Sequence, residues 1–176
     1  STPDHTHANI SKSAMEKGIH VYVQKPLTHN VKEARMLTEL ARKNKIVTQM
    51  GNQGSSNPEQ KMVQKWIKDG RIGKVSTVYT WTNRPVWAQG SPMPKPDPSQ
   101  KPEGMDWDLW IGPAKNNGYT PGLHAFSWRG YWEYGTGSLG DMGCHIMDVP
   151  IKALGIFDPF SICLLYTSDA ADDSYR

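Results

Sequence analysis

Residues 20–26 have the sequence HVYVQKP, a short β-branched and aromatic run that ends in a lysine followed by proline. Such a run is typical of a strand, and the proline keeps the backbone of Lys25 extended. In open α/β sheets, ligands bind beyond the carboxyl ends of the strands. Lys25 can therefore meet a substrate, although its residue type fits a strand end in solvent equally well.

Helix and strand patterns alternate around this segment through the first 70 residues. In order, the sequence predicts a helix over 6–17, a strand over 19–24, a helix over 30–44, a strand over 46–50 and a helix over 58–69. Short alternation of this kind favours parallel strands with crossover helices. We therefore predict an α/β fold, the C-terminal half of a doubly wound Rossmann-type sheet, and expect a further strand ahead of Ser1.

Turn and capping residues indicate where these helices begin and end. Gly18 and Gly70 occupy positions where a helix closes on a left-handed residue. Asn30 and Glu33 form a capping-box pattern, and Pro58 stands at the first position of the third helix.

The pattern changes after the third helix. Residues 74–81 predict a longer strand without a crossover helix behind it, and residues 84–104 contain six prolines, which is typical of an extended surface loop. We expect one partial domain over 1–70 and a second over 71–162. Residues 163–176 resemble the in-frame translation of a transposase sequencing adapter, so we exclude them from the fold.

The composition is that of a globular protein. Of the 176 residues, 37% are hydrophobic and 21% are charged, and no run of about 18 apolar residues predicts a membrane span. The formal net charge of +3 is scattered over helix faces, so we expect no nucleic-acid partner. Cys144 is the single cysteine ahead of the adapter-like segment, which excludes an intrachain disulfide. Because the chain opens at Ser1 in the middle of a motif, localisation in the cytoplasm or the periplasm stays open.

A glycine motif and an acid–histidine pair stand next to each other near the end of the chain. Residues 135–140, GTGSLG, match the dinucleotide fingerprint literally, but no buried strand precedes them and too little chain follows for a βαβ unit. We interpret that match as coincidental. Asp141 and His145 are four residues apart, which on a helix lets the carboxylate orient the imidazole of a general base. A capped helix with a core-facing histidine is the ordinary alternative.

Two groups of residues resemble metal ligand sets, namely His5 with His7, and Asp141 with His145 and Asp148. In both groups, the spacing suits helix capping and packing better than coordination. We therefore expect no metal.

Tryptophans are concentrated in one stretch of the chain. Six of the seven lie between Trp81 and Trp132. Their faces fit a carbohydrate platform, and core packing is the commoner alternative.

Four short motifs occur in order: TPDH at 2–5 with His7, QKP at 24–26, GRIG at 70–73 and GDMGCHIMD at 140–148. Together and at this spacing they resemble the Gfo/Idh/MocA family, the glucose–fructose oxidoreductase, inositol dehydrogenase and MocA proteins. The resemblance extends from Ser1 to about Phe160. The resemblance favours a catalytic role for Asp141 and His145 over a purely structural role in a capped helix.

The resemblance implies a fold and an activity. Family members carry an N-terminal Rossmann domain for NAD or NADP and a C-terminal α/β domain with an open, mostly antiparallel sheet that often mediates homo-oligomerisation. It implies an oxidoreductase that transfers hydride between the nicotinamide and a secondary hydroxyl of a small-molecule sugar or polyol. A glycoside hydrolase that retains its NAD and acts by transient oxidation and elimination is one alternative, and a non-catalytic sugar-binding relative is another.

The resemblance also implies site residues. Those expected beside the cofactor are Thr2, Pro3, His5, Gln24 and Lys25. The resemblance also implies three catalytic roles. Lys25 would contact both substrate and nicotinamide, Asp141 would orient the substrate hydroxyl, and His145 would take the proton of that hydroxyl.

The sequence departs from the family pattern in two places. No glycine-rich phosphate loop stands ahead of these motifs, so we expect the isolated chain to be inactive and to bind NAD weakly or not at all. Gln24 replaces the glutamate that usually precedes the Lys-Pro pair. We expect this replacement to remove a carboxylate partner from Lys25.

Overall fold

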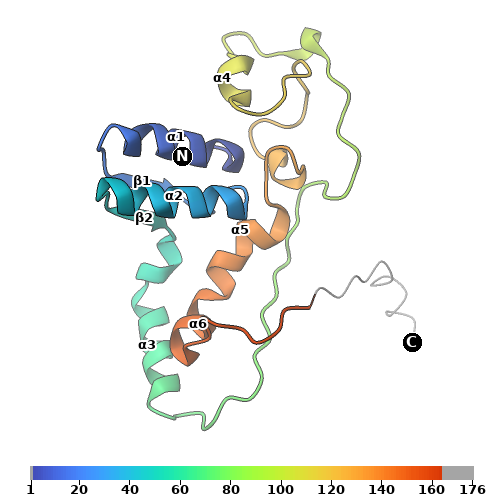
Figure 1. Ribbon diagram of the computed structural model, residues 1–176. Helices are drawn as coiled ribbons and strands as arrows, with labels where there is room; N and C mark the ends of the chain where they lie inside the picture. Colours follow the sequence, from blue (N-terminus) through green and yellow to red (C-terminus); the bar gives the residue numbers. More distant parts are fainter. Residues whose placement is uncertain (1, 164–176) are drawn as a thin grey trace, which may run out of the picture.

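A computed structural model describes residues 2–163 of the chain (Figure 1). We call residues 2–73 the first region and residues 74–163 the second region. Cys163 is the first residue of the adapter-like segment, and the rest of that segment lies outside the described residues.

The first region contains a small parallel sheet and the helices that pack around it. In order, its elements are α1 (Asp4–Glu16), β1 (Val21–Gln24), α2 (Val31–Asn44), β2 (Thr48–Gly51) and α3 (Pro58–Lys68). β1 and β2 are parallel, with Val21 opposite Thr48 and Gln24 opposite Gly51. α2 connects the two strands, and α1 packs against both α2 and β1. The predicted parallel pairing with a crossover helix is confirmed for these strands.

The helix ends follow the capping residues. Asn30 Oδ1 accepts from the Glu33 N–H at 3.0 Å, and Glu33 Oε2 accepts from the Asn30 N–H at 3.3 Å, so the capping box is confirmed. Gly18 and Gly70 follow α1 and α3 with φ values of 76° and 71°. α2 ends instead on Lys45, a non-glycine residue with a φ of 54°.

Both strands begin two residues later than predicted, because the backbone N–H groups of Ile19 and Ile46 bond to the preceding helices. The Ile19 N–H donates to the Ala14 oxygen at 3.0 Å, and the Ile46 N–H donates to the Ala41 oxygen at 2.9 Å. These bonds close the last turns of α1 and α2. α1 also begins two residues earlier than predicted, at Asp4, where an acidic side chain is favourable near a helix N-terminus.

Each region has its own apolar core. The α1–α2 cluster of the first region consists of Ala8, Met15, Leu37 and Ile46. The aromatic cluster of the second region consists of Trp107, Ile111, Tyr119, Leu123, Trp128, Tyr131 and Tyr134. Most of the tryptophan-rich stretch therefore serves as core, although Trp81 and Trp132 are exposed.

Short helices follow the loops of the second region. They are α4 (Trp107–Ile111), α5 (Gly137–Ile146) and α6 (Asp148–Leu154). α6 packs along α3, and α5 leads from residues 127–130 to α6 (Figure 1). The second region thus folds back onto the first. None of the helices in the described residues has the length and apolar character needed to cross a membrane.

Residues 74–81, predicted as a strand, form no regular element and lead from the end of α3 into the rest of the second region (Figure 1). Tyr79 and Trp81 on this segment are 81% and 80% exposed. A strand needs a neighbour for its backbone hydrogen bonds, and within residues 2–163 the strands β1 and β2 pair with each other. The described residues therefore form no antiparallel sheet.

Candidate active site

A cavity of about 660 Å³ lies where the two regions meet. The residues on its wall include Thr2, Pro3, Asp4, Gln24 and Lys25 from the first region, and Trp110, His124, Trp128, Arg129 and Asp141 from the second. The carboxyl end of β1 therefore opens into this cavity, as expected for a ligand site in an open α/β sheet.

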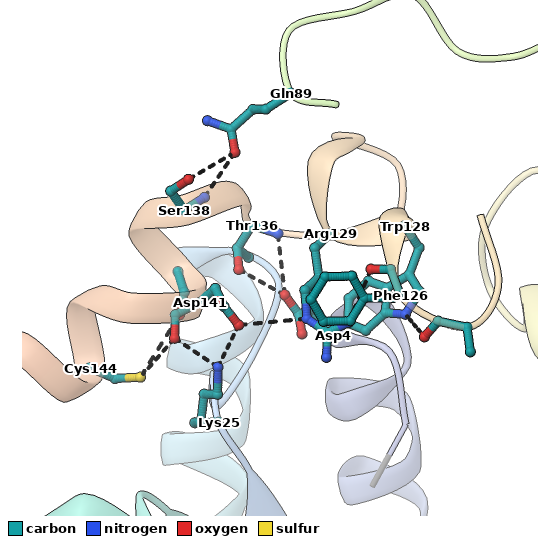
Figure 2. A network of polar contacts seen from close by, with 12 residues as sticks. Asp4, Lys25, Gln89, Phe126, Trp128, Arg129, Thr136, Ser138, Asp141 and Cys144 are labelled. Carbon is teal, nitrogen blue, oxygen red and sulfur yellow. Dashed lines mark hydrogen bonds and ion pairs between the residues drawn. The ribbon is translucent and has the colours of Figure 1, made fainter. Parts of the chain in front are cut away.

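Lys25 and Asp141 form an ion pair at this cavity (Figure 2). Lys25 Nζ lies 2.7 Å from Asp141 Oδ1 and 2.7 Å from the Asp141 backbone oxygen. The two side chains are only 15% and 12% exposed, so solvent screens the pair weakly. Lys25 thus has an anionic partner despite Gln24, because the carboxylate comes from α5 rather than from the neighbouring position in sequence.

Arg129 brings a second cation to the same carboxylate (Figure 2). Its Nε lies 3.6 Å from Asp141 Oδ1. Its guanidinium lies over the rings of Phe126 and Trp128, at 4.6 Å and 4.3 Å from their centroids, and donates to the Phe126 oxygen at 3.0 Å. These cation–π contacts hold the arginine at the cavity wall. Sequence analysis missed Arg129, because the residues around it form no recognisable motif.

His145 lies one helical turn beyond Asp141 and is not among the residues that line the cavity. Its Nδ1 faces Gly54, where an added Cβ would lie 3.9 Å away. Burial lowers the pKa of His145 below its ordinary value of 6.5, and Lys25 lowers it further. Asp141 and Asp148 shift this pKa in the opposite direction. A histidine whose neutral form is favoured is suited to accept a proton.

Four of the five residues expected at the cofactor, Thr2, Pro3, Gln24 and Lys25, lie on the cavity wall. His5 does not lie on this wall. Its buried ring lies with Nε2 3.0 Å from the Ile111 oxygen and Nδ1 3.3 Å from the Tyr134 oxygen. Burial also lowers the pKa of His5. Because α1 already begins at Asp4, His5 is turned toward the second region, where it ties the two regions together.

His7, the other histidine of the His-Thr-His motif, is also buried against backbone oxygens. Its Nε2 lies 2.8 Å from the Thr2 oxygen, and its Nδ1 lies 2.7 Å from the Pro26 oxygen. In residues 2–163, no three His, Cys, Asp or Glu side chains group together in a way that could hold a metal ion.

Two family models match the chain. The "Oxidoreductase family, NAD-binding Rossmann fold" model matches residues 1–52, and the "Oxidoreductase family, C-terminal alpha/beta domain" model matches residues 56–161. The chain therefore belongs to the Gfo/Idh/MocA oxidoreductase family, and the resemblance noted in the sequence is confirmed.

Two curated relatives are dehydrogenases of bacteria. Levoglucosan dehydrogenase of Pseudarthrobacter phenanthrenivorans is 24% identical over 163 residues, which are 93% of this chain and 34% of that protein. The scyllo-inositol 2-dehydrogenase (NAD(+)) of Bacillus subtilis is 30% identical over 73 residues, which are 42% of this chain and 21% of that protein. The chain thus spans about a third and about a fifth of these relatives.

Solved structures show the same fold. An oxidoreductase domain protein from Kribbella flavida aligns with a TM-score of 0.55 and 28% identity, over 88% of this chain and 34% of that one. An inositol dehydrogenase homolog from Azotobacter vinelandii, complexed with NADH and myo-inositol, aligns with a TM-score of 0.54 and 22% identity, over 89% of this chain and 32% of that one.

Proposed function

We propose that this chain is part of an NAD(P)-dependent oxidoreductase that transfers hydride between the nicotinamide and a secondary hydroxyl of a sugar or polyol. The observation that carries this proposal is the 2.7 Å contact between Lys25 Nζ and Asp141 Oδ1 at one cavity. Two charged side chains from separate regions meet there, beside Thr2 and Pro3. The family and the names of the two curated relatives support the same chemistry.

The first-region wall of the cavity fits a nicotinamide cofactor. Gln24 is the last residue of β1, at the end of the strand where ligands of open α/β sheets bind, and Thr2 and Pro3 line the same cavity. The Thr6 hydroxyl donates to Thr2 Oγ1 at 2.6 Å, which fixes Thr2 at this wall. When bound, the nicotinamide supplies the acceptor for the hydride that leaves the substrate carbon.

Each charged residue has its own proposed role. Lys25 stabilises the negative charge that develops on the substrate oxygen, and Asp141 orients the hydroxyl. His145 accepts the hydroxyl proton, because burial lowers its pKa and favours the neutral ring. Since His145 does not line the cavity, we propose that bridging water carries the proton to its ring.

We also propose how the second region is completed in the whole protein. Its boundary with the Rossmann-type domain lies near Gly70, and residues 74–81 join an open, mostly antiparallel sheet that supports a homo-oligomer. The exposed Tyr79 and Trp81 side chains support this pairing, since large apolar side chains of one segment are rarely left in water.

The experiment uses the whole protein that contains this chain. It is incubated with NAD or NADP and with levoglucosan, scyllo-inositol or common pyranoses, and formation of reduced cofactor is followed. His145→Ala is expected to lower turnover by roughly 10² to 10⁴, with cofactor affinity nearly unchanged, because it removes only the base. His20→Ala, which removes an exposed histidine next to β1, is the matched control.

Three outcomes would contradict parts of the proposal. Full turnover in His145→Ala would remove His145 from the reaction. Cleavage of a glycosidic bond without net formation of reduced cofactor would favour the NAD-retaining glycoside hydrolase. Sugar binding without either reaction would favour a non-catalytic relative.

A further inference from the structure

Helix α5, which carries Asp141 and His145, begins without a capping bond of its own. Its N-cap residue, Thr136, has no side-chain capping bond to the first turn. The first backbone N–H groups of a helix have no partner inside the helix, so they need acceptors from elsewhere. The Ser138 N–H finds one in Gln89 Oε1, at 2.9 Å (Figure 2).

The other acceptor comes from the first region, through Asp4 (Figure 2). Asp4 Oδ2 accepts from the Thr136 N–H at 3.2 Å and from the Thr136 hydroxyl at 2.7 Å. Asp4 is only 5% exposed, so both bonds are shielded from water. A carboxylate from α1 thus supplies the cap that the sequence of α5 lacks.

The same part of α1 holds the other half of the ion pair. His7, one turn beyond Asp4, lies with Nδ1 2.7 Å from the oxygen of Pro26, the residue after Lys25. Its Nε2 lies 2.8 Å from the oxygen of Thr2. The first two turns of α1 therefore contact the Thr2 segment, the Lys25 segment and the start of α5.

We propose that Asp4 is a positioning residue: by capping α5 from the other region, its carboxylate sets where Asp141 and His145 stand relative to Lys25. The catalytic consequence rests on the proposed function, whereas the cap itself does not. Asp4 lies on the cavity wall, so a direct contact with the ligand is the rival role that the experiment must separate from positioning.

The chemistry of Asp4 gives a graded series of variants. Burial raises the pKa of the Asp4 carboxyl, and its hydrogen bonds to Thr136 act in the opposite direction. Asp4→Asn keeps one acceptor oxygen without the charge, whereas Asp4→Ala keeps neither. Thr136→Val removes the hydroxyl donor and leaves the backbone N–H in place. The series thus separates loss of charge from loss of the cap.

The first measurement is amide hydrogen exchange on the chain itself. Asp4→Ala is expected to lower protection in the first turn of α5 roughly fivefold, since loss of a helix cap has about that effect on the opening equilibrium. Asp97→Ala is the matched control, because Asp97 also accepts from the backbone N–H and hydroxyl of one residue, Ser99, far along the chain from α5. It should leave protection in α5 unchanged.

A double-mutant cycle of Asp4→Ala and Thr136→Val then tests whether the two residues act together. The effects on α5 protection should be less than multiplicative, because either variant already removes the shared hydroxyl bond. Independent effects of the two changes, or unchanged protection in Asp4→Ala, would overturn the cap. Neither result depends on enzymatic activity.

The second measurement separates positioning from ligand binding in the whole protein. Asp4→Ala should lower kcat roughly 10- to 100-fold with little change in sugar KM, and Asp4→Asn should recover most of it, because a small displacement of catalytic groups has this effect. Equal rises in KM in both variants, with α5 protection intact, would show a direct ligand contact and overturn the positioning role. Absence of activity in the unmutated protein would count against the proposed function and leave the exchange result standing.

Discussion

The two regions support their halves of the site in different ways. Lys25 stands at the end of β1, which packs against α1, and α1 shares the α1–α2 cluster with α2. Asp141 stands on α5, which contacts α6 and residues 127–130 at the aromatic cluster. One half of the site is thus supported by regular helices and strands, and the other by side-chain packing across loops. The contacts that join them decide whether the site is aligned.

Aromatic packing takes the place of a sheet in the second region. Trp107 stacks on Trp110 with ring centroids 4.6 Å apart, and its edge contact with Tyr119 spans 5.1 Å. His5 reaches this cluster from α1, through the Ile111 oxygen. Such rings have strong orientational preferences, so the cluster fixes the loops that carry them.

The largest expected effects on the free energy of unfolding come from truncating one buried side chain in each core. Met15 and Leu123 are both 0% exposed, one in each cluster. Each change to alanine should cost about 2 to 5 kcal/mol in the free energy of unfolding. We expect the cost of Leu123→Ala to lie at the upper end of this range, because the rigid rings around Leu123 cannot move into the cavity that is left. The helices around Met15 can shift into the space that Met15→Ala leaves, so its cost should be lower. Urea denaturation followed by tryptophan fluorescence measures both.

Hydrogen exchange shows whether the two cores are independent. Met15→Ala should lower protection in α1 and α2, and Leu123→Ala should lower it around α4 and residues 127–134. Met62→Ala, at a position 45% exposed, is the control for loss of a surface methionine side chain. If either core variant lowered protection equally in both regions, they would form one cooperative unit and the comparison between them would fail.

The first region was largely predictable from the sequence, because its signals are local. The glycine stops and the capping box act within a few residues, and the parallel pairing follows from the alternation of helices and strands. The strand limits were wrong at Ile19 and Ile46, since each amide closes the preceding helix instead. That choice depends on three-dimensional packing of the helix end.

The site was only partly predictable, because several of its contacts depend on three-dimensional packing rather than on local sequence. Lys25 and Asp141 were expected at one site, and the structure brings them together. Arg129 and Asp4 had no expected role. No recognisable motif surrounds Arg129, and the partner of Asp4, Thr136, lies 132 positions away in the sequence. The contacts of His5 were not predicted, since its partners are backbone oxygens, which the pattern of residue types does not reveal.

An intermediate effect is expected where the two regions are joined by charge. The Lys25–Asp141 and Lys65–Asp69 pairs have nearly equal N–O distances, 2.7 Å and 2.6 Å, but the side chains of the second pair are 72% and 43% exposed. Lys25→Met should cost about 2 kcal/mol in the free energy of unfolding, because it leaves a largely buried carboxylate with the more distant Arg129. Lys65→Met should cost less than about 0.5 kcal/mol. Equal costs would show that the cavity is as well hydrated as the surface.

The smallest expected effect is a change in the titration of His145, whose pKa depends on Lys25 from the first region and on Asp141 from the second. Burial lowers its pKa below 6.5, with a further lowering by Lys25 and a raising by Asp141. A histidine whose pKa is lowered by folding stabilises the protein fully above pH 6.5, and this contribution is lost as the pH falls from 6.5 through the folded pKa. Nuclear magnetic resonance of the ring protons should therefore give a midpoint below 6.5.

Charge variants then test which half of the site controls this titration. Lys25→Met should raise the His145 midpoint, because it removes a nearby cation and leaves the Asp141 carboxylate in place. Asp141→Asn should lower it, because the cation then acts without its anion. Lys12→Met removes an exposed lysine that pairs with Glu16 on α1 and should leave the midpoint unchanged. If Lys25→Met and Asp141→Asn moved the midpoint in the same direction, α5 would have shifted as a whole, and its position would depend on the ion pair as well as on the Asp4 cap.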